Sequence, residues 1–190
     1  MPDKRAVSTE FPRNWWIITG ADYSGKTTVI EQLSLQGIAT LPEQGMEVMG
    51  EYEAMGMTAE EMLADQPRLQ YKILDRKIAA EAQHDSSTLT FIDRGLPDTL
   101  GFLSYYGIPL RAQAKEIISH ASYRGVFFFE QLPLAGFTPD FAHSEGRNFM
   151  ARIGGFIHEA YVESGFRPIH VPVMSVADRV AFVLQHARGC

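Results

Sequence analysis

One short segment constrains this chain more than any other: residues 20–27, GADYSGKT, fit the pattern G-x-x-x-x-G-K-[ST]. The run of aromatic and β-branched residues at 15–19 before it predicts a buried strand. In residues 27–36 after it, apolar residues recur on one helical face. A glycine-bearing loop between a strand and a helix is the setting in which this pattern holds phosphates, so we predict a phosphate-binding loop rather than an ordinary turn.

The residue types of this loop suit that chemistry. Gly20 and Gly25 permit backbone angles and a close approach that a Cβ would block, so that N–H groups can point at phosphate oxygens. The N-terminus of the next helix adds partial positive charge. We expect Lys26 to reach the β- and γ-phosphates and Thr27 to offer its hydroxyl to Mg²⁺, which favours a nucleoside triphosphate. The expected nucleotide-binding residues are Gly20, Ala21, Asp22, Tyr23, Ser24, Gly25, Lys26, Thr27 and Thr28.

Strands alternate with helices along the rest of the chain. The predicted strands are 15–19, 38–41, 89–92, 126–130 and 169–171. The predicted helices are 27–36, 60–83 with a break at Pro67, 96–106, 111–120, 148–164 and 176–186. Residues 46–57 have no clear pattern, and 133–146 are expected to be irregular. Compact apolar strands between helices indicate an α/β fold with about five parallel strands covered on both faces.

The length of 190 residues fits a single domain, expected over 14–190 after a flexible N-terminal tail at 1–13. A net charge of −6 argues against nucleic acid as the main partner. We expect no membrane span and no secretory signal, because no long apolar run occurs. The one cysteine, Cys190, allows no internal disulfide, and we expect a cytoplasmic protein. The oligomeric state is left open, with a homodimer as one option.

A carboxylate stands at the end of the third predicted strand. Asp93 follows a buried apolar run, at the edge where ligands bind in open parallel sheets. Asp93 is therefore expected to complete the Mg²⁺ site that Thr27 begins. The alternative is that Asp93 caps the helix predicted from Leu96, although Pro97-Asp98 offers a more ordinary helix start. The neighbouring Arg94 either binds a phosphate or pairs with a surface acid.

Residues 20–28 (GADYSGKTT) and 91–99 (FIDRGLPDT) together resemble the AAA-type predicted ATPase family that contains the ribosylnicotinamide kinase domain, within the nucleoside and nucleotide kinase group. The similarity extends to Glu43, to Gln70 and to the segments 160–166, 171–173 and 176–180. It implies a P-loop NTPase fold, a three-layer sandwich with a lid. It also implies transfer of the γ-phosphoryl group to a small nucleoside- or nucleotide-like acceptor.

The loop departs from that family at Asp22-Tyr23, where members often carry small residues such as Gly-Pro. An acid at this place is similar to thymidylate kinase, whose loop reads Gly-x-Asp-Gly-x-Gly-Lys-Thr and directs the acid at the acceptor. The likeness implies a carboxylate beside the phosphates, which Mg²⁺, Lys26 or Arg94 must compensate. Asp22 is then either the group that accepts a proton from the substrate hydroxyl or a loop-shaping Asx turn.

Two more residues are candidates for the acceptor side. Glu43, just after the second predicted strand, either accepts the proton of an acceptor hydroxyl or is an exposed loop acid. Gln70 either reads a polar edge of the acceptor or is solvated on its amphipathic helix.

In kinases of this group the segment corresponding to about 131–152 is a lid whose arginine reaches the transferred phosphoryl group. Arg147 is the first candidate for that arginine and Arg152 the second, and either could instead pair with a nearby glutamate. The catalytic residues expected on this basis are Asp22, Lys26, Asp93, Arg94 and Arg147.

The cofactors expected are Mg²⁺ and ATP or GTP, and the lack of an Asn-Lys-x-Asp guanine-reading motif favours ATP. Phosphoryl transfer to a small molecule is the function that these residues favour. The competing function is a nucleotide-dependent switch ATPase that acts on a protein or lipid partner.

Overall fold

The computed structural model describes residues 14–133 and 144–189, so the expected tail at 1–13 and the middle of the expected lid lie outside the described residues. Five strands form one parallel sheet in the order β2-β3-β1-β4-β5. The strands are β1 (Trp15–Gly20), β2 (Ala39–Leu41), β3 (Thr90–Asp93), β4 (Gly125–Phe129) and β5 (Ile169–Val171). In the register, Ile18 lies opposite Asp93 and Gly20 opposite Phe129. The carboxyl ends of the strands therefore meet along one edge of the sheet.

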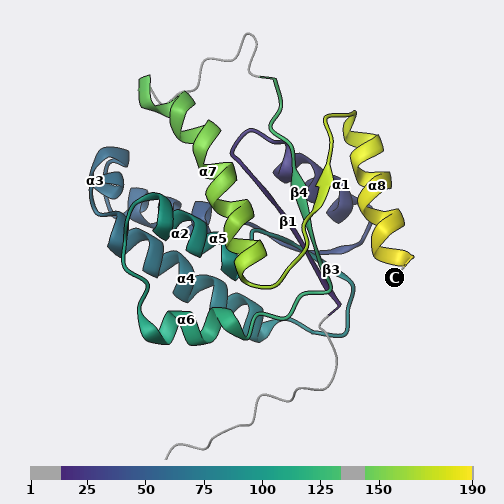
Figure 1. Ribbon diagram of the computed structural model, residues 1–190, viewed down its shortest axis with the longest axis horizontal. Helices are drawn as coiled ribbons and strands as arrows, with labels where there is room; N and C mark the ends of the chain where they lie inside the picture. The colour runs from purple at the N-terminus through teal and green to yellow at the C-terminus, as the bar shows by residue number, and fades with distance from the viewer. Residues whose placement is uncertain (1–13, 134–143, 190) are drawn as a thin grey trace, which may run out of the picture.

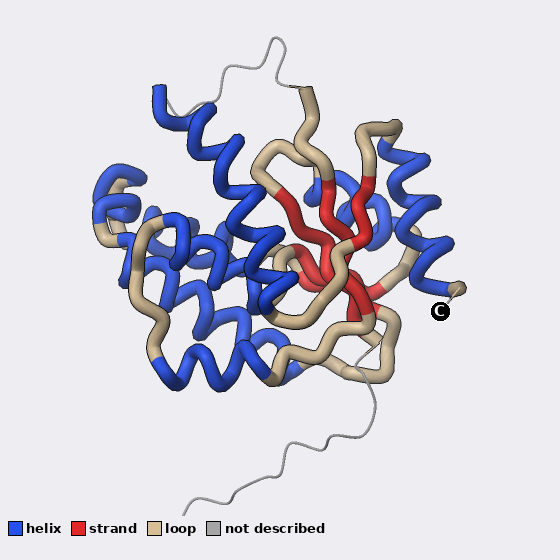
Figure 2. Tube along the Cα trace, in the orientation of Figure 1, coloured by secondary structure: helices blue, strands red, loops and turns tan. Residues whose placement is uncertain are grey.

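Helices cover both faces of the sheet, which confirms the α/β architecture (Figure 1). They are α1 (Lys26–Leu35), α2 (Gln44–Ala54), α3 (Ala59–Ala64), α4 (Gln66–Gln83), α5 (Leu96–Tyr105), α6 (Ala112–Ser119), α7 (Ser144–Glu163) and α8 (Val176–Arg188). Figure 2 shows α1 and α8 on one side of the strands and α7 with the α4–α6 group on the other. No helix in the described ranges is both long and apolar enough to cross a bilayer.

Alternation along β1 builds a core on each face of the sheet. Trp16 and Ile18 pack on one face with residues of α1 and α8, whereas Trp15 and Ile17 pack on the other with residues of α7. A strand covered on both faces needs apolar residues at successive positions, as residues 15–18 of this strand have. Both tryptophans are buried, which confirms the buried strand predicted at 15–19.

The structure differs from the expected elements in three places. Residues 44–54, mostly within the unassigned stretch, form α2 because Val48 and Tyr52 pack against Met62 and Leu69. The break expected at Pro67 falls at Asp65, whose side chain caps α4. Helix α7 begins at Ser144, inside the segment expected to be irregular.

Candidate nucleotide and acceptor site

The loop after β1 needs its glycines. Gly20 has φ 138°, and a Cβ there would lie 2.5 Å from the Phe129 carbonyl oxygen of the neighbouring strand. Gly25 has φ 79° and is the N-cap of α1, and Tyr23 also adopts a positive φ of 56°. The loop therefore turns from the strand into the helix through backbone conformations that residues other than glycine rarely adopt.

Lys26 folds back onto the loop. Its Nζ donates to the Ala21 carbonyl oxygen at 2.7 Å and to the Ser24 hydroxyl at 3.2 Å. Burial, with the charge of Arg94 as a second cause, lowers the pKa of Lys26 to about 8. An anion beside this ammonium would stabilise its charged form, so a phosphate bound at the loop would raise the pKa of Lys26 again.

Thr27 and Asp93 meet across the site. The Thr27 hydroxyl lies 3.4 Å from Asp93 Oδ2, and the buried Oδ1 of Asp93 has no hydrogen-bond partner among the described residues. Burial and then the charge of Glu43 raise the pKa of Asp93 to about 6. A buried carboxylate oxygen without a donor, next to a hydroxyl, suits a hard cation such as Mg²⁺. The capping alternative for Asp93 is wrong, because Gly95 is the N-cap of α5 and no side chain caps it.

Arg94 gathers acids from three elements. Its Nη2 lies 2.5 Å from Asp22 Oδ1, its Nε 3.0 Å from Glu43 Oε1, and its Nη1 3.1 Å from Asp98 Oδ1. Nη1 also donates to the Gly20 carbonyl oxygen at 3.0 Å. Burial disfavours the charge of Arg94, but the three carboxylates outweigh it and raise the pKa of Arg94 above its ordinary value. Arg94 therefore pairs with acids, two of them partly exposed, and its binding of a phosphate stays a prediction.

The same geometry places the two acceptor candidates. The side chains of Asp22 and Glu43 are 40% and 25% exposed and share the Arg94 guanidinium, so they lie on one patch of the site. Glu43 is therefore not the free loop acid of the alternative reading. The charge of Glu43 acts on Asp93, whereas that of Asp22 acts on Tyr106, whose pKa burial and then Tyr105 and Asp22 raise to about 12.

Asp98 is a site residue that sequence reasoning missed. It is fully buried and accepts from the Thr19 hydroxyl at 2.6 Å and from the Tyr161 hydroxyl at 2.5 Å, besides Arg94. The Pro97-Asp98 pair had suggested an ordinary helix start. No local signal in the sequence indicates the pairing with Arg94, because Arg94 lies before α5 with a positive φ of 63°.

The turn between β3 and α5 is held from three other elements. Tyr161 of α7 accepts a hydrogen bond from the Gly95 N–H at 3.1 Å, and Lys77 of α4 donates to the Gly95 carbonyl oxygen at 2.9 Å. Tyr123 accepts from the Leu96 N–H at 3.0 Å and donates to Glu81 at 2.6 Å. These buried bonds fix the backbone that carries Arg94.

Gln70 is buried on α4, and its amide donates to Gln66 Oε1 at 3.1 Å, so the alternative of a solvated side chain is wrong. Arg152 is exposed on α7 with its guanidinium 5.6 Å from the centre of the Tyr105 ring. Arg147 lies on the first half of α7, and its side chain is outside the described residues. The structure thus places Arg152, but not Arg147, beside the aromatic end of α5.

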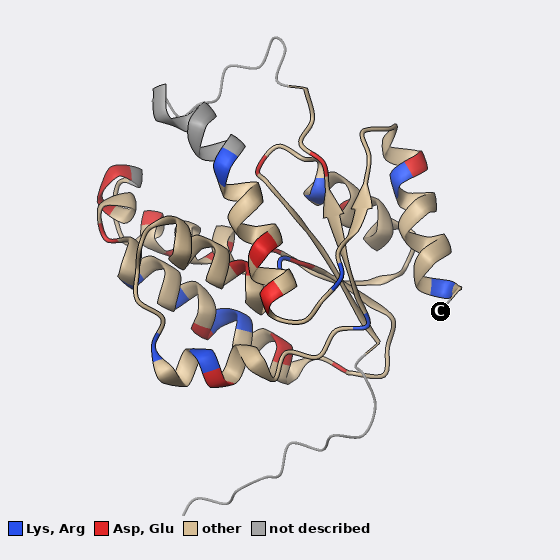
Figure 3. Cartoon of the chain, in the orientation of Figure 1, with Lys and Arg blue, Asp and Glu red and all other residues tan. Residues whose placement is uncertain are grey.

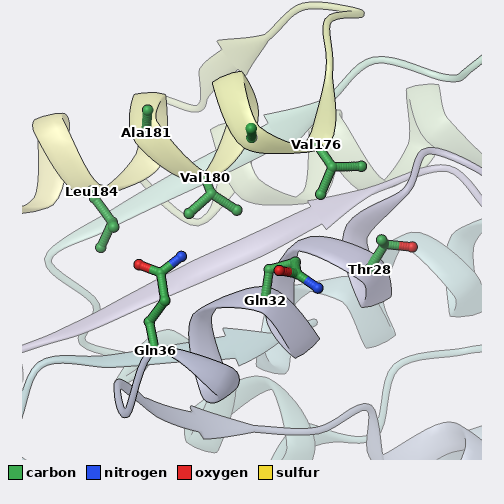
Figure 4. Close-up of a pocket in the computed structure, with 8 residues that line it drawn as sticks. Thr28, Gln32, Gln36, Val176, Val180, Ala181 and Leu184 are labelled. Carbon is green, nitrogen blue, oxygen red and sulfur yellow. The ribbon is translucent and has the colours of Figure 1, made fainter.

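Thr28 faces a groove between α1 and α8 with a volume of about 630 Å³. Figure 4 shows Thr28, Gln32 and Gln36 on the α1 side and apolar residues of α8 opposite them. The groove therefore begins at the first turn of the helix that follows the loop.

In the view of Figure 3, Lys and Arg are interspersed with Asp and Glu over the outer helices.

Comparisons with known proteins agree with this geometry. A family model described as an AAA domain matches residues 15–179. The sequence matches no curated protein. Among solved structures the chain is similar to thymidylate kinase from Ehrlichia chaffeensis, at 12% identity over 94% of this chain and 100% of that one, with a TM-score of 0.58.

Two further structures are similar. Deoxyadenosine kinase from M. mycoides with bound dCTP shares 12% identity over 93% of this chain and 100% of that one, with a TM-score of 0.63. NadR protein in complex with NR shares 13% identity over 94% of this chain, with a TM-score of 0.66, and the match spans 51% of that chain. At these identities the likeness is one of fold.

Proposed function

Because the chain belongs to the AAA domain family and has the α/β P-loop NTPase fold, we propose that it is a kinase that transfers the γ-phosphoryl group of ATP, with Mg²⁺, to a hydroxyl of a small nucleoside-like acceptor. The family and the fold support nucleotide binding, and the site residues of this chain support the reaction and the class of acceptor. The location we propose for it is the cytoplasm, where ATP is available.

The observation that carries the proposal is the pair of carboxylates held by Arg94. Asp22 comes from the loop and Glu43 from the end of β2, yet both lie within 3.0 Å of the same guanidinium. Phosphoryl transfer needs a base, such as a carboxylate, near the attacking hydroxyl. Otherwise it needs mainly positioning and charge neutralisation. A partly exposed acid pair beside a phosphate loop supplies that group.

The charge of this patch also favours the class of acceptor. The carboxylates of Asp22 and Glu43 are partly exposed whereas the Arg94 guanidinium is buried, so the charge that the described acceptor side presents is negative. An acceptor that already carries a phosphate would be repelled there, whereas a neutral or cationic hydroxyl compound would not. We therefore favour a nucleoside or another polyol over a nucleoside monophosphate.

The chain's own residues divide the work. The loop backbone and Lys26 hold the β- and γ-phosphates, and Thr27 with Asp93 would hold Mg²⁺. When bound, the cation supplies neutralisation of charge on the phosphates. We assign the proton of the acceptor hydroxyl to Glu43, whose carboxylate is partly exposed and lies 3.0 Å from Arg94. Asp22 and Tyr106 orient the acceptor, and Gln70 binds its polar edge. Arg147 or Arg152, both on α7, contacts the transferred phosphoryl group.

The test is a panel of nucleosides and polyols incubated with Mg-ATP, with ADP release and product mass as readouts. We expect one class of hydroxyl compound to stimulate ADP release strongly and to gain a phosphoryl group. Glu43→Gln should abolish the stimulation, while Glu53→Gln, an exposed acid at the end of α2, should not. Slow turnover that no acceptor stimulates, in wild type, would contradict the kinase and favour a switch ATPase.

A further inference from the structure

Helix α8 sends one arginine under the phosphate loop. Arg179 is 2% exposed and is one of the largest fully buried side chains among the described residues. Its Nη1 donates to the Ser24 carbonyl oxygen of the loop, and its Nε donates to the Pro172 carbonyl oxygen at 3.1 Å. Its Nη2 makes a longer contact of 3.4 Å with the Glu130 carbonyl oxygen.

The three carbonyl groups belong to the segments that leave three neighbouring strands. Ser24 follows β1, Glu130 follows β4 and Pro172 follows β5. The β4 exit touches the loop a second time, because the Leu132 N–H donates to the Tyr23 carbonyl oxygen at 3.3 Å. One guanidinium therefore ties the loop to the two segments beside it.

The fit of Arg179 against the loop depends on a glycine. A Cβ built at Gly25 would lie 3.2 Å from Arg179 Nη1, which is tighter than ordinary contact. The missing side chain lets the guanidinium lie directly against the turn into α1, where the loop changes into the helix. The planar fork can reach three carbonyl oxygens at once, which the single ammonium of a lysine cannot do.

The surroundings of the Arg179 guanidinium differ from those of the Arg94 guanidinium. Arg94 pairs with three carboxylates, whereas the contacts of Arg179 with the described residues are carbonyl oxygens and the ring of Phe129, 5.2 Å away. Burial lowers the pKa of Arg179, and the charge of Glu130 only partly opposes this. A buried cation without a paired carboxylate is unfavourable, so an anion on the other side of the loop would stabilise it.

We propose that Arg179 is a positioning residue for the triphosphate: it fixes the loop between the β4 and β5 exits and sets behind it a positive charge that has no carboxylate partner among the described residues. The proposal rests on the proposed nucleotide site, and it adds a residue that does not touch the nucleotide. The charge favours ligands in proportion to their phosphates, and the fork sets the loop geometry in which the phosphates are held.

The experiment compares Arg179→Lys and Arg179→Met with wild type. Isothermal titration calorimetry measures binding of Mg-ATP, AMP and inorganic tripolyphosphate at two salt concentrations. We expect R179M to weaken tripolyphosphate and ATP by about 100-fold and R179K by about 10-fold, the range that positioning partners around a bound ligand typically give. AMP binding should change much less. Arg188→Met, an exposed arginine at the end of the same helix, is the matched control and should bind as wild type does.

The outcomes separate the alternatives. Equal weakening for AMP and ATP, or none, in variants with wild-type circular dichroism would overturn the role of Arg179 and leave the nucleotide site intact. If R179M fails to fold, the same comparison is made on R179K, which keeps the charge and loses the fork. A wild-type protein that binds neither ATP nor tripolyphosphate would overturn the proposed function, and the role of Arg179 with it.

Discussion

The Thr27 hydroxyl and the Asp93 carboxylate lie 3.4 Å apart although 66 residues separate them in the chain. The parallel pairing of β1 with β3 brings them together, because Asp93 lies opposite Ile18, two residues before the loop begins. Thr27 is exposed and Asp93 is buried, so a cation between them would have one protein ligand on each side of the boundary with solvent. Activity needs the charged carboxylate of Asp93 at the cation, whereas the burial of that charge lowers the stability of the ligand-free protein.

Asp93→Asn should stabilise the ligand-free protein and abolish Mg²⁺-dependent phosphoryl transfer. The pKa of Asp93 is raised from 3.8 to about 6, so the folded protein binds the proton more tightly than the unfolded chain. Asp93 therefore costs stability as the pH rises from 3.8 through about 6, on the order of 3 kcal/mol. Urea unfolding should show the gain of D93N in full at pH 8 and none near pH 3.8. A loss of stability at pH 8 would contradict this reading of the carboxylate.

Triphosphate binding should weaken above pH 8. In the ligand-free protein burial lowers the pKa of Lys26 to about 8, so at pH 9 only a minority of molecules carry the ammonium that the phosphates need. The apparent Kd should rise about tenfold between pH 7.5 and pH 9. Lys26→Arg keeps its charge throughout this range, and calorimetry should show a nearly flat profile for it. An equal rise in both proteins would mean that another group titrates.

The two acceptor acids should differ in their kinetics. Glu43→Gln should lower kcat by about 100-fold or more and leave the Kd of Mg-ATP unchanged, because Glu43 acts on the acceptor proton. Asp22→Asn should mainly raise KM for the acceptor, since we assign Asp22 to orienting the acceptor and not to proton transfer. Steady-state kinetics with the acceptor found in the panel measures both. The reverse pattern would assign the proton to Asp22.

The fold was predictable because its signals are local. The loop motif fixes one strand and one helix, and short apolar runs between amphipathic segments indicate the parallel sheet. Helix α2 was not predictable in this way, since Gly45, Gly50 and the methionines weaken the local pattern. Packing of Val48 and Tyr52 against α3 and α4 decides its conformation.

The site could be predicted only where its chemistry lies in a motif. The roles predicted for Lys26, Thr27 and Asp93 come from the local sequence, at or near the ends of recognisable strands. Asp98 and Arg179 do not, because their roles come from contacts with residues 63 to 155 positions away. In the sequence each looks like a charged residue near the start of an amphipathic helix, whose ordinary place is the surface.

Tyr161→Phe should destabilise the protein by about 2 to 3 kcal/mol. The Tyr161 hydroxyl donates to Asp98 and accepts from the Gly95 N–H, so its loss leaves a buried carboxylate oxygen and a buried N–H with one partner fewer. Urea unfolding measures the change. Tyr52→Phe is the control: Tyr52 is also buried, but its hydroxyl makes no hydrogen bond with the described residues, and the change should stay within about 0.5 kcal/mol.

The same substitution tests whether α7 and Arg94 act as a unit. Asp98 binds Arg94 on one oxygen and Tyr161 on the other, so freeing the second oxygen lets the carboxylate shift and moves the guanidinium that holds Asp22 and Glu43. Y161F should therefore lower kcat more than it changes the Kd of Mg-ATP, because the hydrogen bonds of Lys26 go to Ala21 and Ser24, outside this network. A variant that is less stable but keeps wild-type kcat would show that Tyr161 only supports the fold.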